Sequence, residues 1–569
     1  MRYLALAVDY DGTAATHGKL SDDARRAIER LRVSGRRSIL VTGRRLEDLR
    51  EACRSLSIFD LVVAENGAVV FDPRRHDEIM LADAVPARFV AHLRERGVEQ
   101  LEVGKVIVSA GEHHRITMVD AIRELGLELQ MIFNRSTVMV LPAGVNKATG
   151  LEFALRRLGL SRHEAVAIGD AENDHSLLTF CECGVAVANA ASALKTEAAL
   201  VTRGANGAGV AELIDELIAD DLRRMEGKIE RHLLLVGARA DGTPVRVPPY
   251  GRNVLIAGPS GSGKSTLTAS LVERLIEKQY QVCIIDPEGD YGTLQAVVSL
   301  GNQQRAPSVN EVLSILEDAT VNISVNLLGL PLRDRPSFFS QLIPGLIAMR
   351  ARTGRPHWIV LDEAHHMLPQ ASLFAAATLP QKLGETILVT VHPDHVTPSV
   401  LAPVDVVFAI GHSPENTLRS YADAIERPLA WPSDLAYEAG NVVAWFVREN
   451  SPPFAMQPRP GRAERIRHLR KYAEGNMGYR SFFFRGPDLR HNLRAHNLAA
   501  FSQIAEGIDE ATWLFHLRQH HYSQWFRHSV KDSYLADEME RIERRTDIAP
   551  QQTRDLVREL VGARYTLPE

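Results

Sequence analysis

The sequence has few cysteines, no marked excess of either charge and no long apolar run. Four cysteines among 569 residues are too few and too scattered for a disulfide framework, so we expect buried thiols in a reducing cytoplasm. The 66 basic and 71 acidic residues leave a formal charge of −5, which gives no global footprint for nucleic acid. Asp9 interrupts the apolar opening, so we expect no signal peptide. The one long window without Asp, Glu, Lys or Arg, residues 364–381, contains histidines and prolines and predicts no membrane span.

Length and hydrophobic patterning predict several domains. A chain of 569 residues corresponds to about three or four domains. Strand and helix patterns alternate over the first 220 residues and again after residue 250, and this alternation is typical of parallel sheets covered by helices. We predict an α/β multidomain protein with a Rossmann-like core at 1–222 that carries a small cap at about 81–140, a linker and β-hairpin at 223–250, a RecA-like P-loop domain at 251–450, a linker at 451–477 and a mainly α-helical domain at 478–569.

Two carboxylates follow the first predicted strand. Asp9 and Asp11 stand two residues apart in the run D-Y-D-G-T, and a strand's period of two aims both toward its carboxyl end. Ligands bind at that end in open α/β sheets. One carboxylate can attack a substrate while the other moves protons, and paired acids also hold divalent cations. Taken alone, the motif also occurs in calcium loops and turns, but we favour a chemical role.

Further motifs follow the two carboxylates in a set order. A second strand ends at Thr42, a helix begins near Lys147, and a later strand ends just before Asp170. A strand-end hydroxyl and a lysine are suited to an anionic phosphoryl group. The order and context of these motifs resemble the haloacid dehalogenase superfamily of aspartyl phosphatases over about residues 1–220.

That resemblance implies a role for each residue. Asp9 would be the nucleophile that forms an aspartyl-phosphate, and Asp11 the general acid and then the base. The phosphoryl oxygens would be held by Thr42 and Lys147. The magnesium site implied by the resemblance consists of Asp170, the Asp9 carboxylate and the Asp11 carbonyl, with Asn173 and Asp174 in support.

The cap and one short motif narrow the resemblance. The insertion lies between the threonine and lysine motifs, and Glu65-Asn66-Gly67-Ala68 resembles the N-G-A signature of the Cof-type branch. Caps of that branch commonly select small phosphorylated metabolites, often sugars. A small phosphorylated metabolite, such as a sugar phosphate, is therefore the substrate that the resemblance implies.

A glycine-rich loop stands between a strand and a helix in the second domain. The run from Gly258 to Ser265 matches G-x-x-x-x-G-K-[ST], in which backbone amides surround phosphates and the lysine reaches the terminal ones. We therefore predict an ATP site. The residues expected at the nucleotide are Gly258, Ser260, Gly261, Ser262, Gly263, Lys264, Ser265 and Thr266.

An acidic pair follows another apolar strand about a hundred residues later. Ser265 and Asp362 are suited to magnesium, Glu363 is suited to polarising the attacking water, and Thr390 follows a further strand where a γ-phosphate sensor would lie. These motifs resemble the HerA/FtsK branch of P-loop ATPases over about residues 232–450. Members are typically hexameric motors that move DNA or peptides and use an arginine from a neighbouring subunit. The candidate arginines for that role are Arg350, Arg352 and Arg419.

Together these motifs predict a bifunctional hydrolase. A Mg²⁺-dependent phosphatase would be joined to an ATPase, with Mg²⁺ and ATP as cofactors and a helical C-terminal domain for regulation or assembly. We expect a cytoplasmic protein without a membrane partner that is able to form homo-oligomers, and leave nucleic acid open as a partner. Two alternatives remain at this stage: a ring-forming motor in which the phosphatase domain is a sensor, and a phosphatase gated by ATP.

Overall fold

The structure is a computed structural model that forms two compact units. It describes residues 1–569 apart from 54, 135, 226, 293, 303, 370–383, 438–440, 462–476, 478–479, 531, 546 and 566–569. The first unit contains residues 1–292 and 296–459, and the second contains residues 293–295 and 460–569. Each unit is described by itself below.

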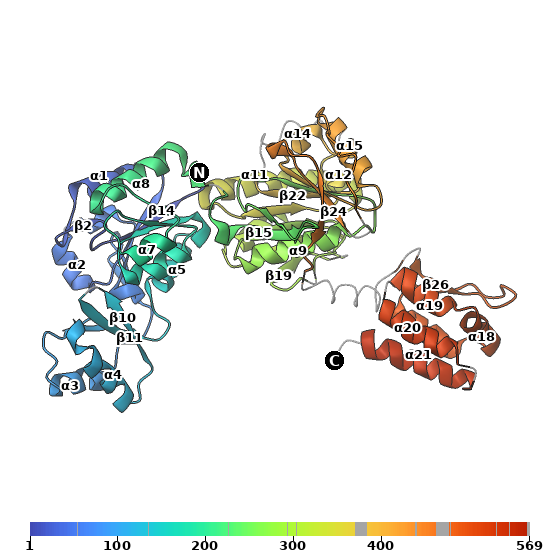
Figure 1. The fold of residues 1–569 in the computed structure, drawn as a ribbon, viewed down its shortest axis with the longest axis horizontal. Coiled ribbons are helices and arrows are strands. Elements are labelled where there is room, and N and C mark those ends of the chain that lie inside the picture. Colours follow the sequence, from blue (N-terminus) through green and yellow to red (C-terminus); the bar gives the residue numbers. More distant parts are fainter. Residues whose placement is uncertain are drawn as a thin grey trace. The chain divides into compact units, whose positions relative to one another are not determined.

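An eight-stranded sheet forms the core of the N-terminal domain (Figure 1). Its inner strands are buried except at Arg37, because helices cover both faces. In sheet order, the strands are β14 (Leu200–Val201), β13 (Cys183–Ala186), β12 (Ala165–Gly169), β1 (Ala5–Asp9), β4 (Arg37–Val41), β5 (Leu61–Ala64), β6 (Val69–Asp72) and β7 (Asp77–Met80). The helices are α1 (Asp22–Val33), α2 (Leu46–Ala52), α5 (Lys147–Arg157), α6 (His175–Phe180), α7 (Ser192–Glu197) and α8 (Asn206–Asp220).

A small α/β cap is inserted between the two halves of this core. Its four strands run in the order β10 (Leu129–Asn134), β11 (Thr137–Pro142), β9 (Val108–Gly111) and β8 (Glu102–Val103), and its helices are α3 (Ala87–Glu95) and α4 (Arg115–Glu124). The cap has its own apolar core, with Phe89, Leu93 and Met118 among its buried members. It is therefore packed as a separate small layer.

An eleven-stranded sheet forms the second domain, with the glycine-rich loop after a central strand. Strand order is β16 (Pro244–Val247), β15 (Leu234–Ala238), β25 (Phe454–Pro458), β24 (Val442–Phe446), β23 (Val406–Ile410), β17 (Val254–Ala257), β22 (Thr386–Thr390), β21 (Trp358–Leu361), β18 (Val282–Asp286), β20 (Asn322–Asn326) and β19 (Val297–Leu300). The helices are α9 (Lys264–Glu277), α10 (Val309–Leu316), α11 (Arg335–Thr353), α12 (Ala364–Met367), α14 (Pro398–Leu401) and α15 (Pro414–Ala424).

The prediction of a linker over 451–477 is wrong for residues 454–458. They form β25, which pairs with β24 on one side and with β15 of the hairpin on the other. Prolines predicted a linker here, but Pro452 and Pro453 precede the strand and Pro458 ends it, where a missing N–H costs little. The rest of that segment from 462 to 476, like residues 370–381 of the charge-free window, lies outside the described residues.

The second unit combines a short hairpin with helices around an aromatic core. Phe482, Phe501, Trp513 and Tyr522 are buried, and the Trp513 and Tyr522 rings stack with centroids 4.6 Å apart. The elements are β26 (Phe482–Phe484), β27 (Leu493–Ala495), α17 (Leu498–Gly507), α18 (Glu510–Arg518), α19 (His521–Trp525), α20 (Ser533–Glu543) and α21 (Pro550–Tyr565). Across the described part of the chain, no helix has both the length and the apolar character that crossing a membrane requires.

A buried polar junction joins the phosphatase-like core to the ATPase-like domain within the first unit. His357 Nδ1 accepts a hydrogen bond from the Gln281 N–H at 2.7 Å, so Nε2 carries the proton and donates it to Glu164 Oε1 at 2.6 Å. Tyr280 stacks on His163 with ring centroids 3.8 Å apart. All of these residues are almost fully buried. The contacts join the strand-start edges of the two sheets.

Candidate functional site

The first candidate site is assembled by three adjacent parallel strands. β1 lies between β4 and β12, so the residues that end or follow these strands share one edge of the sheet. Asp9 ends β1, Thr42 follows β4 and Asp170 follows β12, and all three side chains are buried. The structure thus brings together residues that the sequence separates by up to 161 positions, from 9 to 170.

Lys147 bridges two buried carboxylates at this edge. Its Nζ lies 2.6 Å from Asp9 Oδ1 and 2.6 Å from Asp174 Oδ1. Asn146 fixes the position, because its side chain caps α5 in a capping box with Thr149 and makes Lys147 the first helical residue. Burial alone would lower the pKa of Lys147, but Asp174 and Asp9 outweigh it and raise that pKa. Burial, followed by Asp174, raises the pKa of Asp9 well above its usual range, while Lys147 opposes the shift.

The donor set fits a divalent cation. One carboxylate oxygen from each of Asp9, Asp170 and Asp174 lies within 4.8 Å of the others. Asp174 Oδ2 also accepts hydrogen bonds from the N–H groups of Asp170 and Ala171 at 3.0 Å each, so Asp174 is already bound through both oxygens. Asn173 Oδ1 is buried and accepts no hydrogen bond from the described residues. Carboxylate and amide oxygens are the ligands that Mg²⁺ prefers.

Arg44 is a site residue that the sequence reasoning did not select. Its Nε and a terminal nitrogen donate to the two Asp11 carboxylate oxygens at 2.6 and 2.7 Å, a bidentate pair. Asp11 is therefore held outside the buried group around Asp9, and its side chain is 39% exposed. A basic residue directly after the Thr42-Gly43 strand end is the only local signal that pointed to it.

The cap contacts the edge of the sheet that carries the site, and Glu65 anchors it to the core. The buried Glu65 carboxylate accepts hydrogen bonds from the backbone N–H groups of Lys105, Val106 and Ile107, in the turn between β8 and β9 of the cap, at 2.9 to 3.1 Å. Glu65 has a φ of 51°, in the left-handed region. At the other side, the Met139 side chain of β11 lies against Gly43, where an added Cβ would stand 3.4 Å from its sulfur.

The second candidate site is the loop between β17 and α9. Gly258, Gly261 and Gly263 all have positive φ, and a Cβ at Gly258 would stand 2.1 Å from the Ile410 carbonyl oxygen. Lys264 Nζ donates to the Pro259 carbonyl at 3.1 Å. Ser262 Oγ is buried without a hydrogen-bond partner among the described residues. A loop of this shape, with a lysine that forms no ion pair with described residues and a hydroxyl without a hydrogen-bond partner, fits the phosphates of a nucleotide.

The acidic pair lies on the same edge of the second sheet. Asp362 and Glu363 follow β21, and Glu363 has a φ of 45°. Burial, with Glu363 adding to it, raises the pKa of Asp362 well above its usual range, and burial also raises the pKa of Glu363. Burial lowers the pKa of Lys264, against the effect of both acids. Glu363 Oε2 accepts no hydrogen bond from any described residue. These groups fit a magnesium ion and an attacking water.

Thr390 and the three candidate arginines have partners within the chain. His365 Nδ1 lies 3.0 Å from Thr390 Oγ1 and 3.5 Å from Glu363 Oε2, so His365 connects the expected sensor to the expected base. Burial, helped by neighbouring histidines, lowers the pKa of His365 to about 4. Arg350 donates to four backbone carbonyl groups, Arg352 pairs with Glu317, and Arg419 pairs with Glu415.

Comparisons with known proteins match two parts of the chain. The haloacid dehalogenase-like hydrolase model matches residues 6–109 and 98–214, and the Helicase HerA central domain model matches residues 240–338. Phosphoglycolate phosphatases of Archaeoglobus fulgidus and Methanothermobacter thermautotrophicus are 33% and 30% identical over 217 and 216 residues, which is 37% of this chain and 96% of each relative.

The solved structures that match cover the same N-terminal part. A haloacid dehalogenase-like hydrolase from Bacteroides thetaiotaomicron is 21% identical, covers 38% of this chain and 100% of its own, and has a TM-score of 0.33. The family and relative matches confirm the prediction of a phosphoric monoester hydrolase followed by a HerA-type domain. The chain therefore belongs, through residues 6–214, to the haloacid dehalogenase-like hydrolases.

Proposed function

We propose that this protein is a bifunctional hydrolase with two separate sites, a Mg²⁺-dependent phosphatase and an ATPase. The observation that carries the phosphatase proposal is the Lys147 ammonium group, 2.6 Å from both Asp9 and Asp174, beside the Asp170 carboxylate. This arrangement leaves Asp9 next to a fixed positive charge at the edge of the sheet where ligands bind.

Asp9 acts as the nucleophile in the proposed phosphatase reaction. A carboxylate oxygen of Asp9 attacks phosphorus, the bond from phosphorus to the leaving oxygen breaks, and that oxygen takes a proton from Asp11. Asp11 then removes a proton from water, which attacks the aspartyl-phosphate and releases phosphate and free Asp9. Thr42 and Lys147 hold the phosphoryl oxygens through both steps.

The metal ion and Arg44 position the two reacting carboxylates, Asp9 and Asp11. The carboxylates of Asp9 and Asp170 and the backbone carbonyl of Asp11 would hold Mg²⁺, with Asn173 and Asp174 in support. The bound ion would offset the charge of the phosphoryl group. Arg44 holds Asp11 through two hydrogen bonds. When the phosphate group of the substrate binds the guanidinium instead, Asp11 is free to turn toward the leaving group.

The substrate we propose is a small phosphomonoester. Support comes from relatives named phosphoglycolate phosphatases that match over nearly their whole length. The small cap that reaches the site through Met139 also favours a compact substrate. Phosphoglycolate and sugar phosphates are accordingly the first compounds to assay.

The second site binds and hydrolyses ATP in this proposal. The loop containing Gly258, Ser260, Gly261, Ser262, Gly263, Lys264, Ser265 and Thr266 surrounds the phosphates. Ser265 and Asp362 would hold Mg²⁺, and Glu363 accepts a proton from the attacking water. The placement of the Lys264 loop and of the acidic pair at the same edge of the second sheet supports this assignment.

Reciprocal variants test the two sites separately. Asp9→Asn should lower release of phosphate from p-nitrophenyl phosphate and phosphoglycolate by about a thousandfold or more and leave ATP hydrolysis unchanged. Glu363→Gln should abolish ATP turnover, retain ATP binding and leave the phosphatase unchanged. Asp23→Asn, at an exposed position on α1, is the matched control. Loss of both activities in either variant would contradict the assignment.

Gating of the phosphatase by ATP is a second candidate function. The buried Glu164–His357 hydrogen bond supports it, because β12 leads from Glu164 to Asp170 while β21 leads from His357 to Asp362. Phosphatase rates that do not change with ATP would exclude gating. The HerA central domain match supports the motor alternative, which predicts ATP-dependent rings in light scattering.

A further inference from the structure

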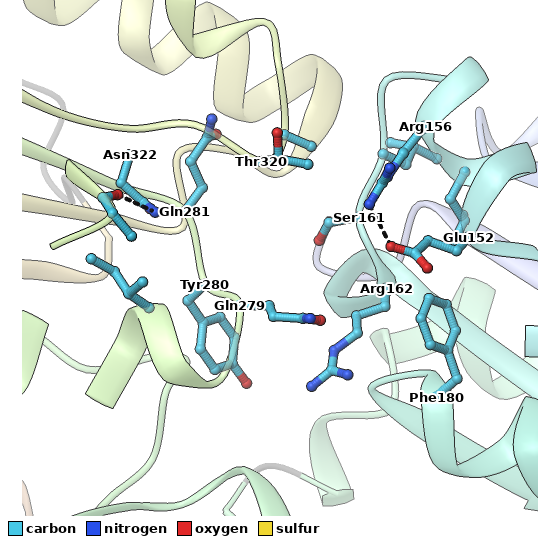
Figure 2. Close-up of a pocket in the computed structure, with 15 residues that line it drawn as sticks. Glu152, Arg156, Ser161, Arg162, Phe180, Gln279, Tyr280, Gln281, Thr320 and Asn322 are labelled. Carbon is cyan, nitrogen blue, oxygen red and sulfur yellow. Dashed lines mark hydrogen bonds and ion pairs between the residues drawn. The ribbon is translucent and has the colours of Figure 1, made fainter. Parts of the chain in front are cut away.

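A cavity of about 340 Å³ lies between the phosphatase-like core and the ATPase-like domain (Figure 2). One wall carries Arg156, Arg162 and Phe180, and the facing wall carries Gln279 and Thr320. This volume is within the range of sites that hold small metabolites. The cavity is lined by residues that neither proposed reaction uses.

Positive charge exceeds negative charge around this cavity. Glu152 pairs with Arg156, but Arg162 is the second cation of the lining. In the part of the chain that the structure describes, no carboxylate lies within ion-pair distance of Arg162, nor of its neighbours Arg231 and Lys278. Arg231 and Lys278 are bonded to backbone carbonyl groups instead. Cations that form no ion pair with described carboxylates favour an anion beside them.

Arg162 has hydrogen-bonding capacity that the protein does not use. Its Nε is buried and donates to no described residue, and one terminal nitrogen reaches only the Lys278 carbonyl at 3.5 Å. In Figure 2 the guanidinium group extends from its wall toward Gln279 on the facing wall, beside the Phe180 ring. Burial and, after it, Arg162 lower the pKa of Lys278. An orphaned buried donor of this kind indicates a missing acceptor.

The His163, Glu182 and His232 side chains behind the cavity do not supply that acceptor. Their ligand atoms lie within 4.8 Å of one another, a spacing that a metal ion would also use. However, the Glu182 carboxylate already receives hydrogen bonds from Arg2 at 2.8 Å and from Tyr280 at 3.2 Å. The surrounding guanidinium groups oppose a further cation at this position, so this group is part of the junction.

We propose that the cavity binds a phosphate-bearing anion of the size of a mononucleotide or phosphorylated metabolite, with Arg162 as its principal ligand. The planar guanidinium donors suit phosphate oxygens, and Gln279 and Thr320 offer further polar contacts. The ligand would touch both domains at once and so stabilise their junction.

The position of the cavity links it to both catalytic lysines. Leu155 and Arg156 lie in the last turn of α5, which begins at Lys147, and Ile276 lies in the last turn of α9, which begins at Lys264. A ligand in the cavity therefore contacts the far end of each helix that carries a site lysine. Bound anion is expected to change both activities in the same protein.

Equilibrium dialysis of the full chain tests the proposal. The parent is the double variant Thr42→Val/Lys264→Ala in magnesium-free buffer, which removes one proposed phosphate ligand from each active site. The probes are inorganic phosphate, pyrophosphate and AMP, with uncharged adenosine for comparison. Added to this parent, Arg162→Ala should weaken binding about tenfold or more, because charge-assisted hydrogen bonds are lost. Arg203→Ala, an exposed arginine outside the cavity lining, should leave binding unchanged.

A second variant keeps the test decisive if Arg162→Ala disturbs the fold. Ala319→Trp, on the facing wall, fills the cavity without removing charge and should also abolish this binding. Binding of AMP and free phosphate with equal affinity would show that the site takes the phosphate group itself, and binding of AMP alone would show an ester site. Adenosine binding as tightly as AMP, or unchanged anion affinity in both cavity variants, would overturn the proposal.

Discussion

The two lysines at the start of α5 and α9 occupy opposite electrostatic situations. Lys147 lies 2.6 Å from two carboxylates, and its pKa is raised. Among the described residues, Lys264 Nζ donates only to the Pro259 carbonyl, and burial lowers the pKa of Lys264. In the phosphatase site, carboxylates already pair with Lys147 before substrate arrives. In the nucleotide loop, the phosphates of the nucleotide would supply the negative charge that pairs with Lys264. The first two of four predictions test this contrast.

The largest expected effect is that of Lys147→Ala on stability. Removing Lys147 leaves the buried Asp9 and Asp174 without their cation, and we expect a loss of about 3–5 kcal/mol from the free energy of unfolding of that domain. Lys264→Ala should leave stability unchanged or slightly higher, because it removes a buried cation that forms no ion pair with any described carboxylate. Urea unfolding followed by circular dichroism measures both. An equal loss of unfolding free energy in the two variants would show that the two lysines do not differ in their electrostatic surroundings.

A smaller effect is expected from ATP on the nucleotide loop. ATP at a hundred times its Kd should raise the free energy of unfolding by about 2.7 kcal/mol in Glu363→Gln, which binds without turnover. The same addition to Lys264→Ala should raise it far less, since the terminal phosphates lose their cation. Asp9→Asn, added to Glu363→Gln, is the matched control and should respond to ATP like Glu363→Gln itself. A full ATP response without Lys264 would show that the loop needs no such charge.

The next effect concerns the cap over the phosphatase site. Glu65→Gln places an amide NH₂ against the backbone N–H groups of Lys105, Val106 and Ile107, so the cap should be held less firmly. We expect the KM for phosphoglycolate to rise about tenfold while kcat changes about twofold or less. Glu51→Gln, at an exposed position on α2, provides the control. A fall in kcat at constant KM would place Glu65 in the chemistry instead.

The smallest effect is the pH dependence of the junction. Burial lowers the pKa of His232 to about 4, below the ordinary value of 6.5, so the unfolded chain binds more protons between these values. Stability should therefore fall as the pH falls from 7 to 5.5, by about 1 kcal/mol from this group. The variant His232→Gln should show a flatter profile over this range. An identical profile in both proteins would assign the pH dependence to other groups.

Residues at strand ends were the ones that sequence reasoning could select. Asp9, Thr42 and Asp170 each follow an apolar strand, and the structure places them at one edge. Arg44 and Glu65 were not selected for their roles, because their partners are distant backbone or side-chain groups that no local pattern reveals. The strand at residues 454–458 was missed for the same reason, since pairing with β15 and β24 outweighs its prolines.

The sequence by itself determined which chemical groups stand at the ends of its strands and helices. Local rules suffice for that, because strand alternation, the glycine-rich loop and the capping residue Asn146 act over a few residues. Only the tertiary structure decided that Lys147 lies between Asp9 and Asp174, and that Glu164 of one domain meets His357 of the other. These contacts join residues 27 to 193 positions apart, and sheet order and domain packing, which depend on the whole chain, bring them together.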